Sequence, residues 1–286
     1  GANDGMLHAI NAEDGQERWA FVPSMVIDNM WKLASKNYDI GHTYYINGDI
    51  VVNDICTANC TTTTATWKTI LVAGLNGGGK GYFALDITNP NSPILLWEFD
   101  TSDDGDLGYS YGNPIITKKS DGTWVAVLTS GYNNVTGSNP NKGQGFLYVL
   151  NANTGTVLNK YSTGVGDSAT PSGLAKVNAY VYDAFVNNTA VYLYGGDLLG
   201  NLWRFDINSP QSSSNPFKLA VLKDPSGTVQ PITVRPELAE ISGKRVIYVG
   251  TGRYLGANDL TDTQQQTIYA ITDENSGTPT TLDNPR

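Results

Sequence analysis

Apolar positions along the chain gather in short runs that are rich in β-branched and aromatic residues and that end in glycine. The clearest example is residues 191–207 (VYLYGGDLLGNLWRFDI), where Val191 and Leu193 precede the glycines and Leu202 and Phe205 follow them. Gly, Asp and Asn dominate the middle of this segment, and these residues tolerate the positive φ angles of a tight turn. The segment therefore predicts two β-strands joined by a short connection.

The same arrangement recurs along the sequence. A β-rich run, a turn or loop, and a second run with an aromatic residue or histidine beside an aliphatic one also occur in residues 1–11, 70–87, 124–151 and 246–272. The second run begins near residues 6, 81, 145, 201 and 267, which gives gaps of 75, 64, 56 and 66 residues. These gaps exceed the about 40–50 residues of a propeller blade, so we expect inserted loops.

Further strand-like segments flank each recurrence. One follows the second run, in residues 18–22, 95–99, 157–161 and 217–221, and one precedes the first run, in residues 109–117 and 229–241. The repeated unit thus has four antiparallel strands, which predicts an all-β fold, a modified β-propeller of four-stranded antiparallel blades with long inserted loops. A β-sandwich is the alternative, because it also has short strands at regular spacing.

The two ends of the chain carry incomplete units. Residues 1–22 supply only the third and fourth strands and residues 229–272 only the first three, with three complete units between them. We expect residues 1–286 to form a single propeller domain from the C-terminal part of a longer protein. Either the two end pieces complete one shared blade, which would remove two exposed edges, or terminal blades are missing.

Composition excludes several classes of protein. Charged residues make up 16% of the chain and the net charge is −9, whereas nucleic-acid binding needs clustered Lys and Arg. No apolar run is long enough to span a membrane. Cys56 and Cys60 are the only cysteines, and a zinc site would need two more nearby ligands from a chain with two histidines. A local disulfide is the better interpretation, and it implies an oxidising compartment.

Five motifs in series are similar to one known family. They are GANDGMLHAINAEDGQERWAFVP, LVAGLNGGGKGYFALDITNP, DLGYSYGNPII, LYGGDLLGNLWRFDI and VGTGRYL, and they run along the whole chain. Together they resemble the C-terminal propeller of the PilY/PilC family, type IV pilus biogenesis factors and tip-associated adhesins that have up to seven blades and a variable N-terminal region, absent here.

The resemblance implies a non-catalytic protein exported by a Gram-negative bacterium to the periplasm, outer membrane, cell surface or pilus tip. It implies a role in pilus assembly by opposing retraction, and in adhesion or surface-associated motility. The implied partners are minor pilins or the pilus assembly machinery, and host or surface ligands. A stand-alone adhesin module is the alternative.

The resemblance also implies a calcium loop before the Gly-Asp-Leu-x-Gly-Asn motif. Asp183 and Asn187 fit its pattern, but Phe185 and Val191 stand where oxygen ligands belong. Calcium requires six to eight oxygen ligands. We therefore expect this loop to be degenerate and to bind calcium weakly or not at all.

A second calcium candidate follows from spacing alone. Asp100, Ser102, Asp104 and Asp106 occupy positions 1, 3, 5 and 7 of an EF-hand-like loop. Position 12 is Tyr111 rather than Glu. The alternative is an exposed acidic loop between blades. No cofactor is assigned, and calcium is the one possible ion.

Enzyme chemistry has little support in the sequence. The repeats also resemble quinoprotein dehydrogenase propellers, but nothing marks a cofactor site, and this stays a remote alternative. His8 occupies a position where the repeats place aromatic residues, so we expect it to pack in the core rather than act as a base. We expect the aromatic residues that recur once per unit to pack between blades, namely Trp19, Trp97, Tyr148, Trp203 and Tyr269. Recognition is expected in the inserted residues 24–66, 132–144 and 209–216.

Overall fold

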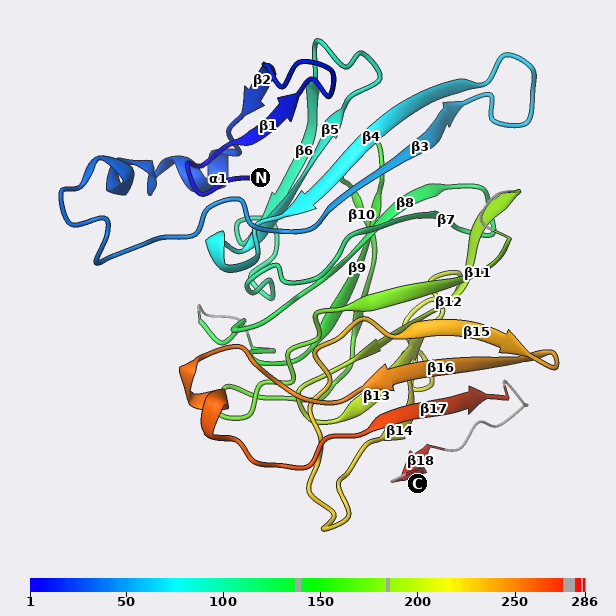
Figure 1. The fold of residues 1–286 in the computed structure, drawn as a ribbon. Helices are drawn as coiled ribbons and strands as arrows, with labels where there is room; N and C mark the ends of the chain where they lie inside the picture. The colour runs from blue at the N-terminus through cyan, green and yellow to red at the C-terminus, as the bar shows by residue number, and fades with distance from the viewer. Residues whose placement is uncertain (137–139, 184–185, 275–280, 284, 286) are drawn as a thin grey trace.

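The computed structural model describes residues 1–136, 140–183, 186–274, 281–283 and 285. Its strands form a series of blades, each built of antiparallel strands, that follow one another in chain order across the molecule (Figure 1). The first sheet contains β1 (Leu7–Ile10) and β2 (Glu17–Phe21), and the second contains β3 (Ile50–Ala58), β4 (Thr66–Gly74), β5 (Gly81–Asp86) and β6 (Ile94–Asp100). Between β2 and β3 lie two short helices, α1 (Ser24–Ile27) and η1 (Met30–Ala34), and η2 (Asn76–Gly78) connects β4 to β5.

The third and fourth blades repeat the four-stranded plan, and the fifth has three strands. The third contains β7 (Ile115–Lys118), β8 (Trp124–Thr129), β9 (Phe146–Asn151) and β10 (Val157–Ser162). The fourth contains β11 (Val177–Asp183), β12 (Asn187–Gly196), β13 (Asn201–Phe205) and β14 (Phe217–Val221), and β18 (Leu282–Asp283) adds to β14 in parallel. The fifth contains β15 (Glu237–Ile241), β16 (Lys244–Gly250) and β17 (Ile268–Asp273), with η3 (Ala257–Thr261) before β17.

The predicted blade repeat is confirmed. The five predicted second runs are β1, β5, β9, β13 and β17, and the second, third and fourth blades each have four strands. The third and fourth blades form one continuous sheet, because β7 pairs in parallel with β12. The shared-blade alternative for the chain ends is wrong within the described residues, since β1–β2 and β15–β16–β17 are separate sheets. They lie at opposite ends of the series of blades (Figure 1). The strands expected at residues 109–117 and 229–241 are shorter than predicted, because each forms only at its C-terminal part.

The core lies between neighbouring blades, where aromatic side chains from the third and fourth strands pack. Tyr148, Trp203 and Tyr269 are buried, and Trp97 donates from its indole Nε1 to the Ala152 carbonyl of the next blade at 2.9 Å. Trp19 is half-buried and donates in the same way to the Pro90 carbonyl of the second blade at 2.8 Å. The predicted role of these residues in packing between blades is thus confirmed.

Candidate functional site

The acidic segment after β6 forms a tight loop held by its own side chains. The Asp100 carboxylate accepts from the Ser102 backbone N–H at 2.6 Å, and the Asp104 carboxylate accepts from the Asp106 N–H at 2.9 Å. Asp103 accepts from the Asp100 N–H at 3.0 Å. Such bonds from Asp to the backbone two residues on are typical of turns.

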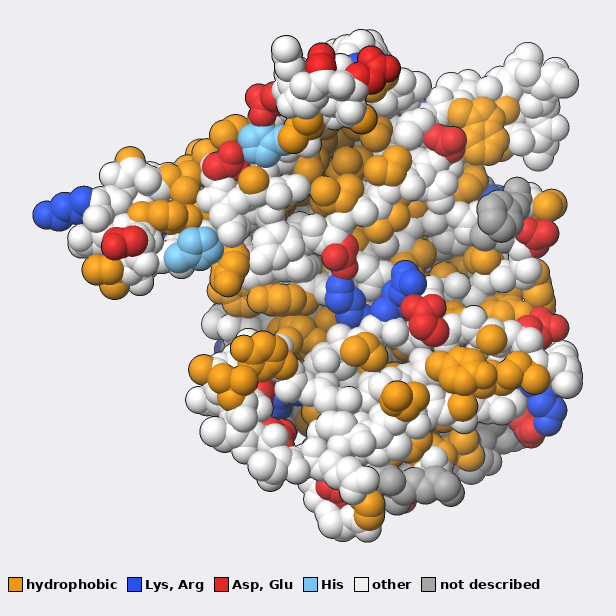
Figure 2. Space-filling model, viewed as in Figure 1, with side chains coloured by type: hydrophobic (Ala, Val, Ile, Leu, Met, Phe, Trp, Pro, Cys, Tyr) orange, Lys and Arg blue, Asp and Glu red, His pale blue; other side chains and the backbone are white. Residues whose placement is uncertain are grey.

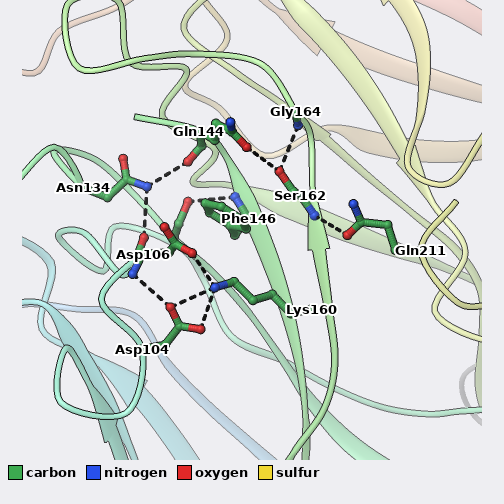
Figure 3. A network of polar contacts seen from close by, with 10 residues as sticks. Asp104, Asp106, Asn134, Gln144, Phe146, Lys160, Ser162, Gly164 and Gln211 are labelled. Atoms are coloured by element: carbon green, nitrogen blue, oxygen red, sulfur yellow. Dashed lines mark hydrogen bonds and ion pairs between the residues drawn. The ribbon is translucent and has the colours of Figure 1, made fainter. Parts of the chain in front are cut away.

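Lys160 on β10 supplies the positive charge for this loop. Its ammonium lies 2.7 Å from one carboxylate oxygen of Asp104 and 2.5 Å from one of Asp106 (Figure 3). The same ammonium lies 4.5 Å from the centre of the Phe146 ring and 5.4 Å from that of Tyr148. The Asp106 side chain is only 3% exposed, so its charge requires a partner in this position.

A polar network continues from the acidic loop across two blades (Figure 3). The Asn134 side chain donates to the Asp106 carbonyl at 2.9 Å and to the Gln144 carbonyl at 2.8 Å. Ser162 donates from its hydroxyl to the Gln144 side chain at 2.7 Å, and its backbone N–H donates to the Gln211 side chain at 2.8 Å. Two segments predicted to carry recognition, residues 132–144 and 209–216, are therefore joined through β10.

The structure brings only part of the proposed calcium ligand set together. Asp104 and Asp106 converge on the Lys160 ammonium, whereas the Asp100 carboxylate bonds to the backbone of its own turn. Among the described residues, no group of three or more His, Cys, Asp or Glu side chains is arranged to hold a metal. Sequence analysis missed Lys160 because it lies 54 residues from Asp106.

We expect calcium not to bind tightly at this loop, because a metal ion would have to displace Lys160. Isothermal titration of the chain with CaCl₂ should give the same heats for the wild type and for Asp104→Ala. Heats that are present in the wild type and lost in Asp104→Ala would instead assign calcium to the loop.

The degenerate calcium loop lies at the end of the β11–β12 hairpin. Asp183 and Asn187 face each other across the two strands. The Asp183 carboxylate accepts from the Val186 N–H at 3.3 Å, and the Asn187 side chain accepts from the Thr189 hydroxyl at 2.6 Å. Phe185 lies outside the described residues. Weak or absent calcium binding here stays a prediction.

Asp197 explains the sequence of the β12–β13 turn. Its fully buried carboxylate accepts from the Leu199 and Asn201 backbone N–H groups at 2.9 Å, and from the Trp203 indole Nε1 at 2.9 Å. Burial raises the pKa of Asp197, and these donors oppose that shift. Gly200 follows at φ +76°, a conformation that favours glycine. The Gly-Asp-Leu-Leu-Gly-Asn sequence therefore forms a turn in which the buried carboxylate accepts hydrogen bonds from residues of the turn and the strand that follows it.

The prediction that His8 packs in the core is wrong. Its side chain lies at the surface of the β1–β2 sheet, with one ring nitrogen 2.9 Å from Asp4 and the other hydrogen-bonded to Glu17. Both ring nitrogens face carboxylates, so the doubly protonated ring satisfies both contacts. The hydrogen bond to Glu17, followed by the contact with Asp4, raises the pKa of His8.

This raised pKa predicts a pH-dependent contribution to folding. Because the folded-state pKa is above the unfolded value, the stabilisation is fully present below about pH 6.5 and is lost as pH rises through the folded pKa. Thermal melts from about pH 5.5 to 8.5 should therefore show a falling Tm difference between the wild type and His8→Gln. A difference that stays constant or grows with pH would contradict this assignment.

The inserted segment between β2 and β3 forms an arm that projects from the blades (Figure 1). Hydrophobic side chains gather on this arm beside charged ones (Figure 2). Trp31 is 67% exposed and Ile40 is 85% exposed. Beyond this segment, Cys56 on β3 and Cys60 in the β3–β4 turn form the predicted disulfide. Contiguous apolar patches rimmed by polar residues are a feature of sites that contact other proteins.

Taken together, the blade topology and the aromatic packing between blades define a β-propeller domain. A family model described as the PilY1 beta-propeller domain matches residues 1–284. The chain belongs to this family.

Curated relatives support the assignment. The chain is 35% identical to a type IV pilus biogenesis factor PilY1 homolog of Xylella fastidiosa, over 98% of this chain and 19% of the relative. It is 34% identical to the type IV pilus biogenesis factor PilY1 of Pseudomonas aeruginosa strain PAO1, over 96% of this chain and 24% of that protein. The chain thus spans about a fifth to a quarter of the length of these relatives.

A solved structure agrees with the same fold. The crystal structure of the Pseudomonas aeruginosa PilY1 C-terminal domain matches with a TM-score of 0.78 and 31% sequence identity, over 99% of this chain and 59% of that one. The described part of our chain contains no helix with the length and apolar character needed to cross a membrane.

Proposed function

We propose that this chain is the propeller of a type IV pilus biogenesis factor, and that it supports pilus assembly by opposing retraction. The observation that carries the proposal is the match to the PilY1 propeller over residues 1–284, together with relatives that are named as pilus biogenesis factors. The domain acts as a non-catalytic binding module. In this role it is exported and reaches the periplasm, the outer membrane or the pilus tip.

The partners we propose are minor pilins or other parts of the pilus assembly machinery. The projecting arm offers the apolar anchor that such a contact needs, since Trp31 and Ile40 are exposed there and aromatic side chains often dominate binding energy at protein interfaces. Lys32 and Asp39 lie on the same arm and would form the polar rim of the contact.

Adhesion to host or abiotic surfaces, with surface-associated motility, is the second candidate function. The two candidate functions predict different phenotypes when residues 1–284 are deleted from the full-length protein in the bacterium that makes it. Pilus number and attachment, measured on the same cells, separate them. Loss of pili after the deletion supports a role in assembly, whereas normal pilus numbers with poor attachment support adhesion and contradict the assembly role.

A further inference from the structure

The β3–β4 hairpin ends in a turn that projects beyond the blades into solvent (Figure 1). Four consecutive threonines, residues 61–64, lie in this turn, and all four are exposed. Residues 57–66 contain no charged side chain, and Figure 2 shows none at this end of the hairpin on the side in view. The turn is therefore an accessible group of hydroxyls that neither the core nor an ion pair uses.

Two of the four hydroxyls stabilise the turn itself. The Thr62 hydroxyl donates to the Asn59 carbonyl at 3.0 Å and lies 2.9 Å from the Thr64 hydroxyl. The Thr62 oxygen also accepts from the Thr64 backbone N–H at 3.3 Å. Bonds of this kind, from a side chain to nearby backbone, are typical of turns formed by Ser and Thr. The hydroxyls of Thr62 and Thr64 are thus engaged in local structure.

The hydroxyls of Thr61 and Thr63 are not engaged in this way. Both side chains are exposed, and their hydroxyls make no hydrogen bond with any residue that the structure describes. An enzyme can therefore approach these two oxygens without breaking a contact of the fold. The alternation along the run also supplies matched controls, because the neighbouring hydroxyls at 62 and 64 are bonded.

The Cys56–Cys60 disulfide beside the turn indicates which modification fits. Disulfides persist in oxidising compartments outside the cytoplasm, whereas phosphorylation of hydroxyls consumes nucleoside triphosphates of the cytoplasm. Exposed segments rich in Ser or Thr are typical acceptors of O-linked sugars, and a bulky polar group is accommodated at an exposed turn. An O-linked sugar is thus the modification that suits both the hydroxyls and the compartment.

Asn59 is the alternative acceptor in the same turn. Asn59, Cys60 and Thr61 match the sequence pattern of N-linked glycosylation. However, Asn59 has a φ of +57°, and the cysteine in the middle of the pattern is bonded to Cys56. A transferase that has to bind all three residues meets a backbone held in a tight turn, which favours the threonines as acceptors.

We propose that Thr61 and Thr63 are O-glycosylated in the exported protein. The threonine Oγ1 attacks the anomeric carbon of a sugar that is joined to a lipid carrier through pyrophosphate. The bond from that carbon to the pyrophosphate oxygen breaks, the new bond to Oγ1 forms, and the hydroxyl proton passes to a base of the transferase. The proposal rests on the export of the protein and not on a role in opposing retraction.

The test uses the full-length protein, purified without reductant from the bacterium that makes it. Trypsin cleavage after Lys36 and Lys68 releases residues 37–68 as one peptide, which carries the four threonines and both cysteines. We expect the mass of this peptide to exceed its sequence mass by one or more sugar residues, and fragmentation to place them on Thr61 and Thr63. The same peptide from a laboratory strain without protein glycosylation should have the sequence mass.

Paired substitutions separate the acceptors from their neighbours. The double variant Thr61→Ala with Thr63→Ala should lose the added mass. The double variant Thr62→Ala with Thr64→Ala is the matched control and should keep it. When both are made without glycosylation, the first variant should have the thermal midpoint of the wild type, because the two hydroxyls it lacks make no hydrogen bond in the fold.

Three results would overturn the proposal. They are an oxidised peptide with the sequence mass, an added mass equal to a phosphate group, and a sugar located on Asn59 or only on Thr62 and Thr64. The disulfide in the same peptide distinguishes a failure of export from a failure of glycosylation. Reduced cysteines would contradict export and the modification with it, whereas an oxidised but unmodified peptide would contradict the glycosylation alone.

Discussion

Replacement of Trp203 by alanine is expected to lower the free energy of unfolding by about 3–5 kcal/mol. The side chain is 3% exposed and packs into the cluster shared by the third and fourth blades. Its loss leaves a cavity there and removes the indole donor from the buried carboxylate of Asp197. Denaturant melts of the purified chain measure the effect.

The matched control is Trp31→Ala, because Trp31 is 67% exposed on the projecting arm. Its substitution should change the free energy of unfolding by no more than about 0.5 kcal/mol. If the two variants lost the same small amount of stability, Trp203 would not be part of the packing between blades.

Replacement of Lys160 by methionine should have an effect of similar size. It leaves the Asp106 carboxylate, which is 3% exposed, without its cation, and removing one partner of a buried ion pair costs about 3–5 kcal/mol. Lys160 is itself 29% exposed, so we expect a value near about 3 kcal/mol. Chemical melts near neutral pH measure it.

A second substitution in the Lys160→Met variant distinguishes charge from packing. Asp106→Asn removes the carboxylate charge that Lys160 faces, so it should restore part of the lost stability at neutral pH. A loss that Asp106→Asn does not relieve would show that only the contact of Lys160 with the Phe146 and Tyr148 rings matters.

The repeat was predictable from the sequence because residues close together in the chain determine where the strands and turns of each blade form. Glycine, Asp and Asn at the turns and β-branched or aromatic residues in the strands recur in every unit, and the Asp197 turn is formed almost entirely by residues close in sequence. The pairing of Cys56 with Cys60 was predictable for the same reason, because the two cysteines are four positions apart.

Contacts between distant segments were not predictable in this way. Lys160 meets Asp104 and Asp106 only because β10 lies beside the loop after β6 in the folded chain. The position of His8 within the repeat suggested a core residue, but the carboxylates of Asp4 and Glu17 hold it at the surface instead. Spacing alone also suggested that Asp100 and Ser102 belong to a calcium ligand set. In the structure the Ser102 backbone N–H donates to the Asp100 carboxylate within the turn.

The number of surface pili on the bacterium that makes this protein is the most direct test of the proposed role in opposing retraction. The measurement counts pili on cells whose full-length protein lacks residues 1–284, with the retraction motor active or inactivated. The proposal predicts few or no pili when the motor is active, and recovery of pili when it is inactive. Wild-type pilus numbers in the deletion strain with an active motor would contradict it.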